Sequence, residues 1–303
     1  MLQILYIILF CNTILIAMRL HEIYKAQKGD TLSISFEFFP PKDEKDISTV
    51  FLDNVSKLLE FNPVLISITS SACGNKDINS KEVLKFLAKN TNVTIMPHLT
   101  CKCASKDNVH EKLDFIKSLN FENILALRGD EPKNIDICYN DFCYANELIS
   151  YIKENTDLSI AAAGYPEGHI DAASLDEDIL NLKRKIDCGA QIIFTQLFFE
   201  NEKFYRYIEK LDEVGIKIPV IAGIMPIISY KQIERMTSLA NITIPNDLAK
   251  QVEKFKDNPL DIKKLGIDFG IEQCKNLVMN GFKNLHFYTL NQYNATSKII
   301  KYI

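Results

Sequence analysis

Eight short runs of apolar and β-branched residues recur along the chain, and most of them lack strict alternation with polar residues. Such runs are typical of parallel strands that are buried on both faces. Between them, residues 48–61 place apolar residues at steps of three and four, and residues 174–189 carry acids early, bases late and a terminal glycine, as amphipathic helices do. The predicted strands cover residues 31–39, 64–70, 92–100, 123–130, 158–166, 191–199, 218–226 and 284–290.

The spacing of these strands indicates how they are connected. The first four end near residues 39, 70, 100 and 130, at intervals of about thirty residues, the length of one β/α unit. Eight strands that alternate with helices predict an α/β fold, a single (β/α)8 TIM barrel. A doubly wound open sheet is the alternative, but no glycine-rich dinucleotide fingerprint follows the first strand.

Polar side chains gather at the carboxyl ends of the predicted strands. In a barrel these ends meet at one mouth, where active sites are built. We therefore expect the active site there, formed by residues at or just past the strand ends. These residues are Glu37, Thr69, His98, Arg128, Asp130, Gln196 and Thr289.

Composition and charge restrict the class of protein. The chain has 303 residues, 47% of them hydrophobic, and a formal net charge of −4. These values fit a globular domain, and the absence of a basic block argues against nucleic acid as a partner. Eight scattered cysteines without a CxxC pair lead us to expect reduced thiols in a cytoplasmic protein, with no disulfide framework and no metal site.

The amino-terminal segment differs from the rest of the chain. Residues 1–17 carry no charge, which on hydropathy alone resembles a membrane or signal segment. A positive n-region and a small-residue cleavage site are both missing. We therefore expect an apolar leader over 1–17, with translation from Met18 favoured and a membrane anchor as the alternative. Residues 18–303 then form the catalytic barrel, beginning with a short polar helix.

Glu37 lies in the stretch SISFEFFPP, between Phe36 and Phe38. An ionisable carboxyl group in apolar surroundings either finds a partner or has a raised pKa. A carboxyl group that stays protonated near neutral pH is suited to general acid catalysis. The alternative is that Glu37 points to solvent from the edge of a strand.

Six motifs, FEFFPPK, PHLTC, ALRGD, GYPEGH, TQLFF and HFYTLN, occur in order between about residues 20 and 292. In this respect the chain resembles methylenetetrahydrofolate reductases of the bacterial type. The resemblance implies a cytoplasmic, homo-oligomeric flavoenzyme with non-covalent FAD. It would reduce 5,10-methylenetetrahydrofolate to 5-methyltetrahydrofolate in a ping-pong reaction with NADH or NADPH, supplying methyl groups for methionine synthesis, with no membrane partner.

The resemblance also implies which residues bind FAD. Residues at the second to fifth strand ends would contact the flavin and the diphosphate, and the helix over 174–189 would hold the ribose, adenine and phosphate end. The implied cofactor residues are Thr69, His98, Arg128, Gly129, Asp130, Tyr144, Ala145, Ala163, Tyr165, His169, Ala172, Asp178, Asn181, Arg184 and Lys185.

The same resemblance assigns the chemistry of the folate. Glu37, kept protonated by its apolar setting, would protonate the leaving nitrogen of the folate ring, and Asp130 would stay ionised beside the resulting cation. Gln196 and Gln232 would hydrogen-bond the folate.

Two positions depart from the common pattern of the family. Gln292 and Met236 replace an arginine and an aromatic residue that often meet the folate, which affects the expected affinity more than the reaction type. Another flavin oxidoreductase on the same barrel, or a non-catalytic folate- or flavin-binding protein, is the alternative function.

Overall fold

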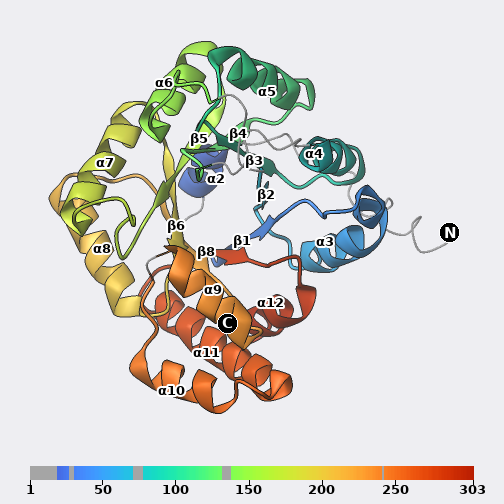
Figure 1. Cartoon of the computed structure of the whole chain (residues 1–303), viewed down its shortest axis with the longest axis vertical. Coiled ribbons are helices and arrows are strands. Elements are labelled where there is room, and N and C mark those ends of the chain that lie inside the picture. The colour runs from blue at the N-terminus through green and yellow to red at the C-terminus, as the bar shows by residue number, and fades with distance from the viewer. Residues whose placement is uncertain (1–18, 27–30, 71–77, 132–137, 241) are drawn as a thin grey trace.

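The computed structural model describes residues 19–26, 31–70, 78–131, 138–240 and 242–303. The predictions for residues 1–17 lie outside these ranges. Within them the chain forms one ring of helices around a central group of strands (Figure 1).

The strands form a closed parallel barrel. Each pairs with the next along the chain, and β8 pairs with β1. This confirms the predicted (β/α)8 barrel, and all eight predicted runs contain a strand. The strands are β1 (Ser33–Phe38), β2 (Leu65–Ile68), β3 (Ile95–Thr100), β4 (Asn123–Leu127), β5 (Ser159–Gly164), β6 (Ile192–Leu197), β7 (Val220–Ile224) and β8 (Asn284–Tyr288).

Helices cover the outside of the barrel. The predicted helix over 48–61 begins with a π-helical turn, η2 (Ile47–Phe51), after the 3-10 turn η1 (Glu44–Asp46). No helix of the described residues is long and apolar enough to cross a membrane. The outer helices are α3 (Leu52–Leu59), α4 (Ile78–Asn90), α5 (Lys106–Ser118), α6 (Ala145–Asn155), α7 (Leu175–Asp187), α8 (Asn201–Glu213), α9 (Tyr230–Ala240), α10 (Asn246–Lys254), α11 (Pro259–Met279) and α12 (Tyr293–Ile300).

Helix α2 (Leu20–Ala26) closes the amino-terminal end of the barrel, in agreement with the short polar helix expected there. Leu20 and Tyr24 are buried in one cluster with Leu65 and Met96, which belong to the barrel interior. Asn123 Oδ1 at the start of β4 accepts a hydrogen bond of 2.7 Å from the backbone N–H of Leu20. Helix α2 therefore fills this end of the barrel.

Strand β1 shows how the two-residue period of a strand divides its side chains. Phe36 and Phe38 are fully buried and pack outward with Phe51 and Phe287. Glu37 points into the barrel instead. The phenylalanines therefore lie on the opposite face of the strand, and the expectation that they form an apolar setting for Glu37 is wrong.

Candidate functional site

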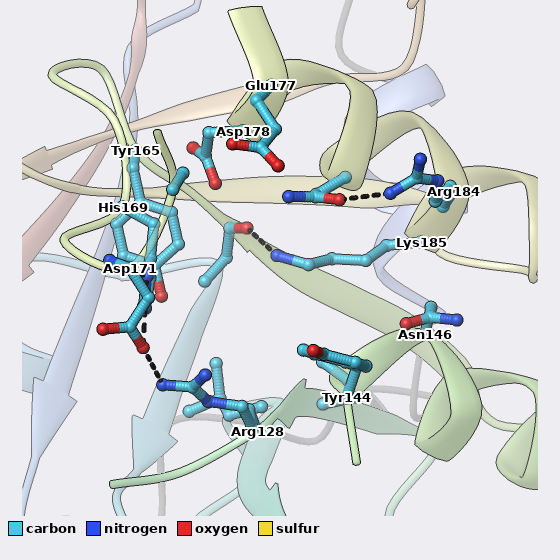
Figure 2. A pocket seen from close by; sticks show the side chains of 16 residues that line it. Arg128, Tyr144, Asn146, Tyr165, His169, Asp171, Glu177, Asp178, Arg184 and Lys185 are labelled. Carbon is cyan, nitrogen blue, oxygen red and sulfur yellow. Dashed lines mark hydrogen bonds and ion pairs between the residues drawn. The ribbon is translucent and has the colours of Figure 1, made fainter. Parts of the chain in front are cut away.

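A pocket of about 470 Å³ lies beyond the carboxyl ends of β4 and β5, between helices α6 and α7 (Figure 2). This volume is within the range of ordinary ligand sites, roughly 300–1,000 Å³. Its lining residues are Ala126, Leu127, Arg128, Tyr144, Ala145, Asn146, Ala163, Tyr165, His169, Asp171, Ala172, Glu177, Asp178, Asn181, Arg184 and Lys185.

The pocket brings together most of the residues that the family resemblance links to FAD. Four of those residues do not line it. Thr69 and His98 line a separate small cavity of about 40 Å³ beside α4 and α5. Gly129 and Asp130 follow β4 directly, and Asp130 is exposed to solvent.

Helix α7 forms one wall of the pocket, and its first turn is fixed by capping. Ser174 Oγ accepts a hydrogen bond of 3.2 Å from the Glu177 N–H, and Glu177 Oε2 accepts one of 2.7 Å from the Ala173 N–H. This reciprocal arrangement satisfies amide groups that a helix start leaves without intrahelical partners. The cap thereby fixes the start of α7, the helix whose side chains Asp178 and Lys185 line the pocket.

Lys185 reaches across the pocket floor. Its Nζ donates a hydrogen bond of 3.1 Å to the carbonyl oxygen of Ala163 and lies 5.7 Å from the centre of the Tyr165 ring. Burial lowers the pKa of Lys185, although nearby Asp178 opposes this shift. Burial raises the pKa of Asp178 and raises that of Tyr165 to about 12. The floor is therefore a poorly solvated place where added negative charge would be stabilised by the ammonium group.

Arg128 and Asp171 form an ion pair on the other side of the pocket. Their Nη2 and Oδ2 atoms are 2.5 Å apart, and the guanidinium group lowers the pKa of the Asp171 carboxyl group. His169 joins the pair through its Nδ1, which accepts a hydrogen bond of 3.1 Å from the Asp171 N–H. Asp171 holds the guanidinium group at the end of β4, ready to meet an anionic ligand.

The sequence analysis missed Asp171, Asn146 and Glu177 as pocket residues. Asp171 stands two residues after His169, and Asn146 follows Ala145, so both adjoin residues that were predicted. Glu177 has a capping role that the spacing from Ser174 indicates.

A second polar group occupies the barrel interior at the mouth. Glu37 Oε2 is 3.6 Å from His98 Nε2 and 3.8 Å from His286 Nε2, which come from β3 and β8. The Glu37 side chain is 18% exposed, and a closed barrel has no strand edge, so the alternative of a solvent-facing edge residue is wrong. Thr289 Oγ1 donates a hydrogen bond of 2.6 Å to the Glu37 carbonyl oxygen, which holds the backbone of this residue.

The environments of His98 and His286 differ. Burial lowers the pKa of His98, which favours the neutral imidazole. His286 is buried, and its Nδ1 lies 2.8 Å from Ser35 Oγ, within hydrogen-bond distance. The ring of His286 also meets those of Phe194 and Tyr288 edge to face. The sequence analysis did not single out His286, although the residue opens the motif HFYTLN.

The predicted folate residues are distributed around the same end of the barrel. Gln196 lies at the end of β6, where its Oε1 accepts a hydrogen bond of 2.9 Å from the Leu197 N–H. Gln232 is bound to its own loop, since its Oε1 accepts from the Ile228 N–H and its Nε2 donates to the Pro226 carbonyl oxygen.

Gln292 and Met236, the two residues that depart from the family pattern, differ in their surroundings. Gln292 is exposed at the start of α12, whereas Met236 packs against an apolar cluster beside β6 and β7.

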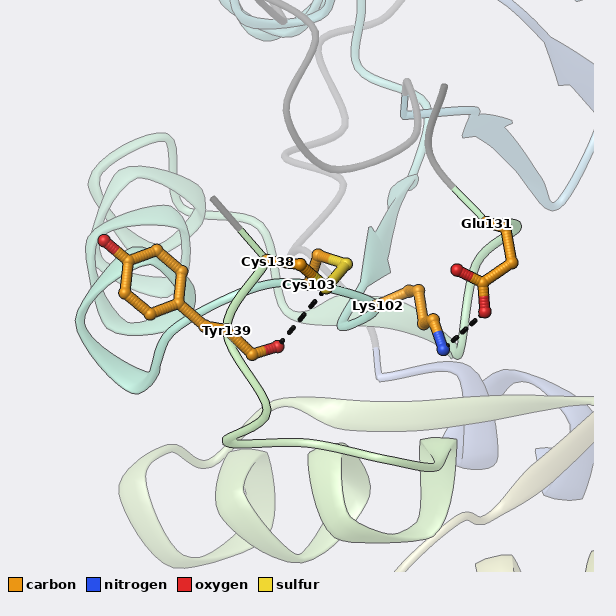
Figure 3. Close-up of a disulfide and its surroundings, with 5 residues drawn as sticks. All are labelled: Lys102, Cys103, Glu131, Cys138 and Tyr139. Atoms are coloured by element: carbon orange, nitrogen blue, oxygen red, sulfur yellow. Dashed lines mark hydrogen bonds and ion pairs between the residues drawn. A yellow bond between two sulfur atoms is a disulfide. The ribbon is translucent and has the colours of Figure 1, made fainter. Parts of the chain in front are cut away.

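The cysteines correct one prediction. Cys103 and Cys138 form a disulfide with a Cα–Cα distance of 4.4 Å (Figure 3), so the expectation of reduced thiols is wrong for this pair. The two cysteines follow β3 and β4, which are neighbours in the barrel, and this brings together residues that are 35 positions apart. In the described residues no group of histidine, cysteine and acidic side chains could hold a metal ion.

Gly164 at the end of β5 gives a test of the packing beneath the pocket. Gly164→Ala is expected to destabilise the protein by about 1–3 kcal/mol, the usual cost of overpacking. The added Cβ would overlap the Tyr207 hydroxyl oxygen and come within 2.7 Å of Ile193 Cγ2. The measurement is urea unfolding of the single variants and of Gly164→Ala with Tyr207→Phe, which removes the oxygen and should restore part of the stability. A Gly164→Ala variant as stable as the wild type would contradict this packing.

Fold and site together define a (β/α)8-barrel protein with a pocket of basic, acidic and aromatic side chains beside β4 and β5 and a carboxyl–imidazole group in its mouth. The family model described as "Methylenetetrahydrofolate reductase" matches residues 20–303. The chain belongs to the methylenetetrahydrofolate reductase family.

Individual relatives agree with this membership. The chain is 35% identical over 264 residues to the 5,10-methylenetetrahydrofolate reductase of Buchnera aphidicola and 32% identical over 267 residues to that of Escherichia coli, covering 89% of each. It is 34% identical over 286 residues to "Methylenetetrahydrofolate reductase (NADH) 1" of Zea mays. The chain spans about half the length of the plant relatives, 48% in the case of the maize protein.

Solved structures support the fold. An uncharacterized protein from Clostridium thermocellum that binds two copies of 5-methyl-5,6,7,8-tetrahydrofolic acid matches with a TM-score of 0.64. The match covers 93% of this chain and 97% of that protein, at 15% sequence identity. At this identity the match concerns the fold.

Proposed function

We propose that this protein reduces 5,10-methylenetetrahydrofolate to 5-methyltetrahydrofolate with a reduced nicotinamide nucleotide, using bound FAD. The observation that carries the proposal is the pocket itself, because most of the FAD residues implied by the family motifs line its walls. The names of the bacterial relatives support the reaction, and the name of the maize relative supports NADH as the hydride donor.

The residues of the pocket fit a flavin dinucleotide chemically. Arg128, Arg184 and Lys185 supply positive charge for a diphosphate, and the side chains of Glu177 and Asp178 are acceptors suited to ribose hydroxyl groups. Tyr144 and Tyr165 offer aromatic faces. Several lining positions are alanines, which leave room for a large ligand.

FAD, when bound, supplies the hydride transfer chemistry, and the residues of the chain bind, orient and protonate. The cations of the pocket would hold the diphosphate and thereby place the reactive ring beside the barrel mouth. Glu37 lies in that mouth, where Thr289 fixes its backbone and His98 and His286 flank its carboxyl group.

Glu37 is the group we propose as the general acid. The five-membered ring of the folate must open to an iminium cation before hydride arrives, so the leaving nitrogen needs a proton. Asp130, exposed beside the mouth, would stabilise the cation, and Gln196, Gln232 and Gln292 would contact the folate.

The test begins with the purified protein. We expect a flavin absorbance spectrum that NADH bleaches and that methylenetetrahydrofolate restores. A protein without flavin, or one whose pocket variants bind FAD as the wild type does, would overturn the flavin site. Bleaching by NADH without recovery by methylenetetrahydrofolate would instead favour another flavin oxidoreductase on the same barrel.

A further inference from the structure

The disulfide between Cys103 and Cys138 (Figure 3) lies in a hollow that shares Arg128 and Tyr144 with the pocket. It joins the loop after β3 to residues 138–144, the segment that leads into α6 and supplies Tyr144 to the pocket. Cys103 is buried, with 6% of its surface exposed, whereas Cys138 is exposed. An attacking thiol can therefore approach the sulfur of Cys138 from solvent.

A second hollow, of about 260 Å³, surrounds this disulfide. Lys102, Cys103, Cys138 and the free, exposed thiol of Cys143 line it. Arg128 and Tyr144 line both this hollow and the larger pocket. The two cavities therefore share these side chains as a wall, with the disulfide on one side and the proposed cofactor site on the other.

Among the described residues, few other contacts hold the first half of this segment, residues 138–141, against the loop after β3. The Tyr139 N–H donates a long hydrogen bond of 3.4 Å to the Cys103 carbonyl oxygen, and Asp141 Oδ2 accepts one of 2.8 Å from the Lys106 N–H. Tyr139, Lys106 and Asp141 are exposed, so water competes for their hydrogen-bonding groups. Phe142 is buried against Tyr151 and anchors the other half. The covalent bond is thus the strongest of these links at Cys138.

We propose that the Cys103–Cys138 disulfide is a redox-sensitive cross-link that stabilises the pocket wall. A dithiol reductant reduces it, and its reduction weakens FAD binding. This inference rests on the proposed function only for the identity of the ligand. The pocket residue that we expect to be affected is Tyr144, which stands six positions after Cys138 in the cross-linked segment.

The chemical step balances with the reductant as the second reactant. One thiolate of the dithiol attacks Cys138 Sγ, the sulfur–sulfur bond breaks, and Cys103 leaves as a thiolate that takes a proton. The second thiol of the reductant then displaces Cys138 from the mixed disulfide. The protein gains two electrons and two protons, and the reductant becomes a disulfide. A low-molecular-weight disulfide would reverse the step.

The consequence for the pocket follows from chain entropy. The cross-link holds Cys138 beside the loop after β3, so its loss lets residues 138–141, which continue from Cys138, sample more conformations. Phe142 and the cap on Glu147 keep the backbone at Tyr144 in place, so the cost falls on the exposed Tyr144 side chain, which must be ordered against this freer stretch when the ligand binds. The affinity for FAD falls, while the barrel, whose strands the disulfide does not join, remains folded.

The first measurement concerns the bond alone and needs no ligand. The protein is purified without reductant and denatured in the presence of iodoacetamide, which alkylates free thiols. It is then digested, and its peptides are identified by mass spectrometry. We expect Cys143 to be alkylated, and Cys103 and Cys138 to resist alkylation until dithiothreitol is added. Full alkylation of Cys103 and Cys138 before reduction would overturn the proposal, whatever the protein's activity.

The second measurement is FAD affinity, from the quenching of flavin fluorescence. Dithiothreitol and Cys138→Ser should each raise the dissociation constant by about tenfold, and the variant should no longer respond to dithiothreitol. Cys143→Ser, the matched control in the same hollow, should bind as the wild type does and keep the response. Equal affinity before and after reduction would overturn the proposal, as would a control variant that behaves like Cys138→Ser. Failure of every form to bind FAD would instead count against the proposed function.

Discussion

Glu37→Gln is expected to slow the reoxidation of the reduced flavin by methylenetetrahydrofolate at least 10²-fold, within the range of about 10²–10⁴ for a lost general acid. Reduction of the flavin by NADH should stay within roughly tenfold of wild type, because that step takes no proton from this side chain. Glutamine keeps the size of the side chain and a polar group beside His98 and His286, but it cannot donate a proton at a useful pKa. Stopped-flow absorbance separates the two half-reactions.

A matched control removes a carboxyl group elsewhere. Glu272 is 78% exposed on α11, and Glu272→Gln should leave both half-reactions unchanged. Equal slowing of both half-reactions in Glu37→Gln would mean that the residue supports the bound flavin. No change in either would mean that the carboxyl group does not take part in the reaction.

The environment of Glu37 illustrates what local sequence leaves out. Three phenylalanines stand near it in the chain, yet Phe36 and Phe38 point to the helices and Phe39 is exposed. Its spatial neighbours, His98 and His286, come from strands that are 61 and 249 positions further along the chain. The alternation of β1 was readable from the sequence, but the imidazoles become neighbours only when the sheet closes.

The barrel itself was predictable because its signals are local. Each strand run is continuous in the sequence, and the regular spacing needs no knowledge of distant contacts. The π-helical turn at Ile47–Phe51 was missed, since its apolar spacing also fits an α-helix. The disulfide was missed for a different reason: its pairing depends on where the loops after two adjacent strands meet, and cysteine spacing does not encode this.

The residues that we propose to bind FAD were partly predictable from the sequence. Asp178, Asn181 and Lys185 share a helix face by their spacing alone, although a charged face is usually solvated. The structure turns this face toward Tyr165 and Ala163 and buries Asp178, which distinguishes it from a surface face. That burial depends on β5 and on the loop after it.

Lys185→Met is expected to lower the affinity for FAD but not the stability of the FAD-free protein. The affinity for FAD should fall by roughly 10- to 100-fold, since a hydrogen bond to a charged group contributes about 1.5–3 kcal/mol. The stability of the protein without FAD should stay the same or rise, because Nζ donates to a neutral carbonyl oxygen and burial already disfavours its charge, as the lowered pKa shows. Methionine keeps the unbranched stem beside Tyr165 without the charge. The measurements are urea unfolding of the FAD-free protein and a fluorescence titration with FAD.

The control for this prediction is on the same helix. Lys183 Nζ also donates to a carbonyl oxygen, that of Val214, but on the side of α7 that faces away from the pocket. Lys183→Met removes the same charge and the same kind of hydrogen bond, so its affinity for FAD should match the wild type. If Lys185→Met lowered stability and affinity together, the lysine would be a structural support of α7. If affinity stayed unchanged, the ammonium group would not meet the ligand. We expect Lys185→Met to lower the affinity for FAD without lowering the stability of the FAD-free protein. Only this result fits a lysine whose buried charge destabilises the free protein and stabilises the complex with FAD.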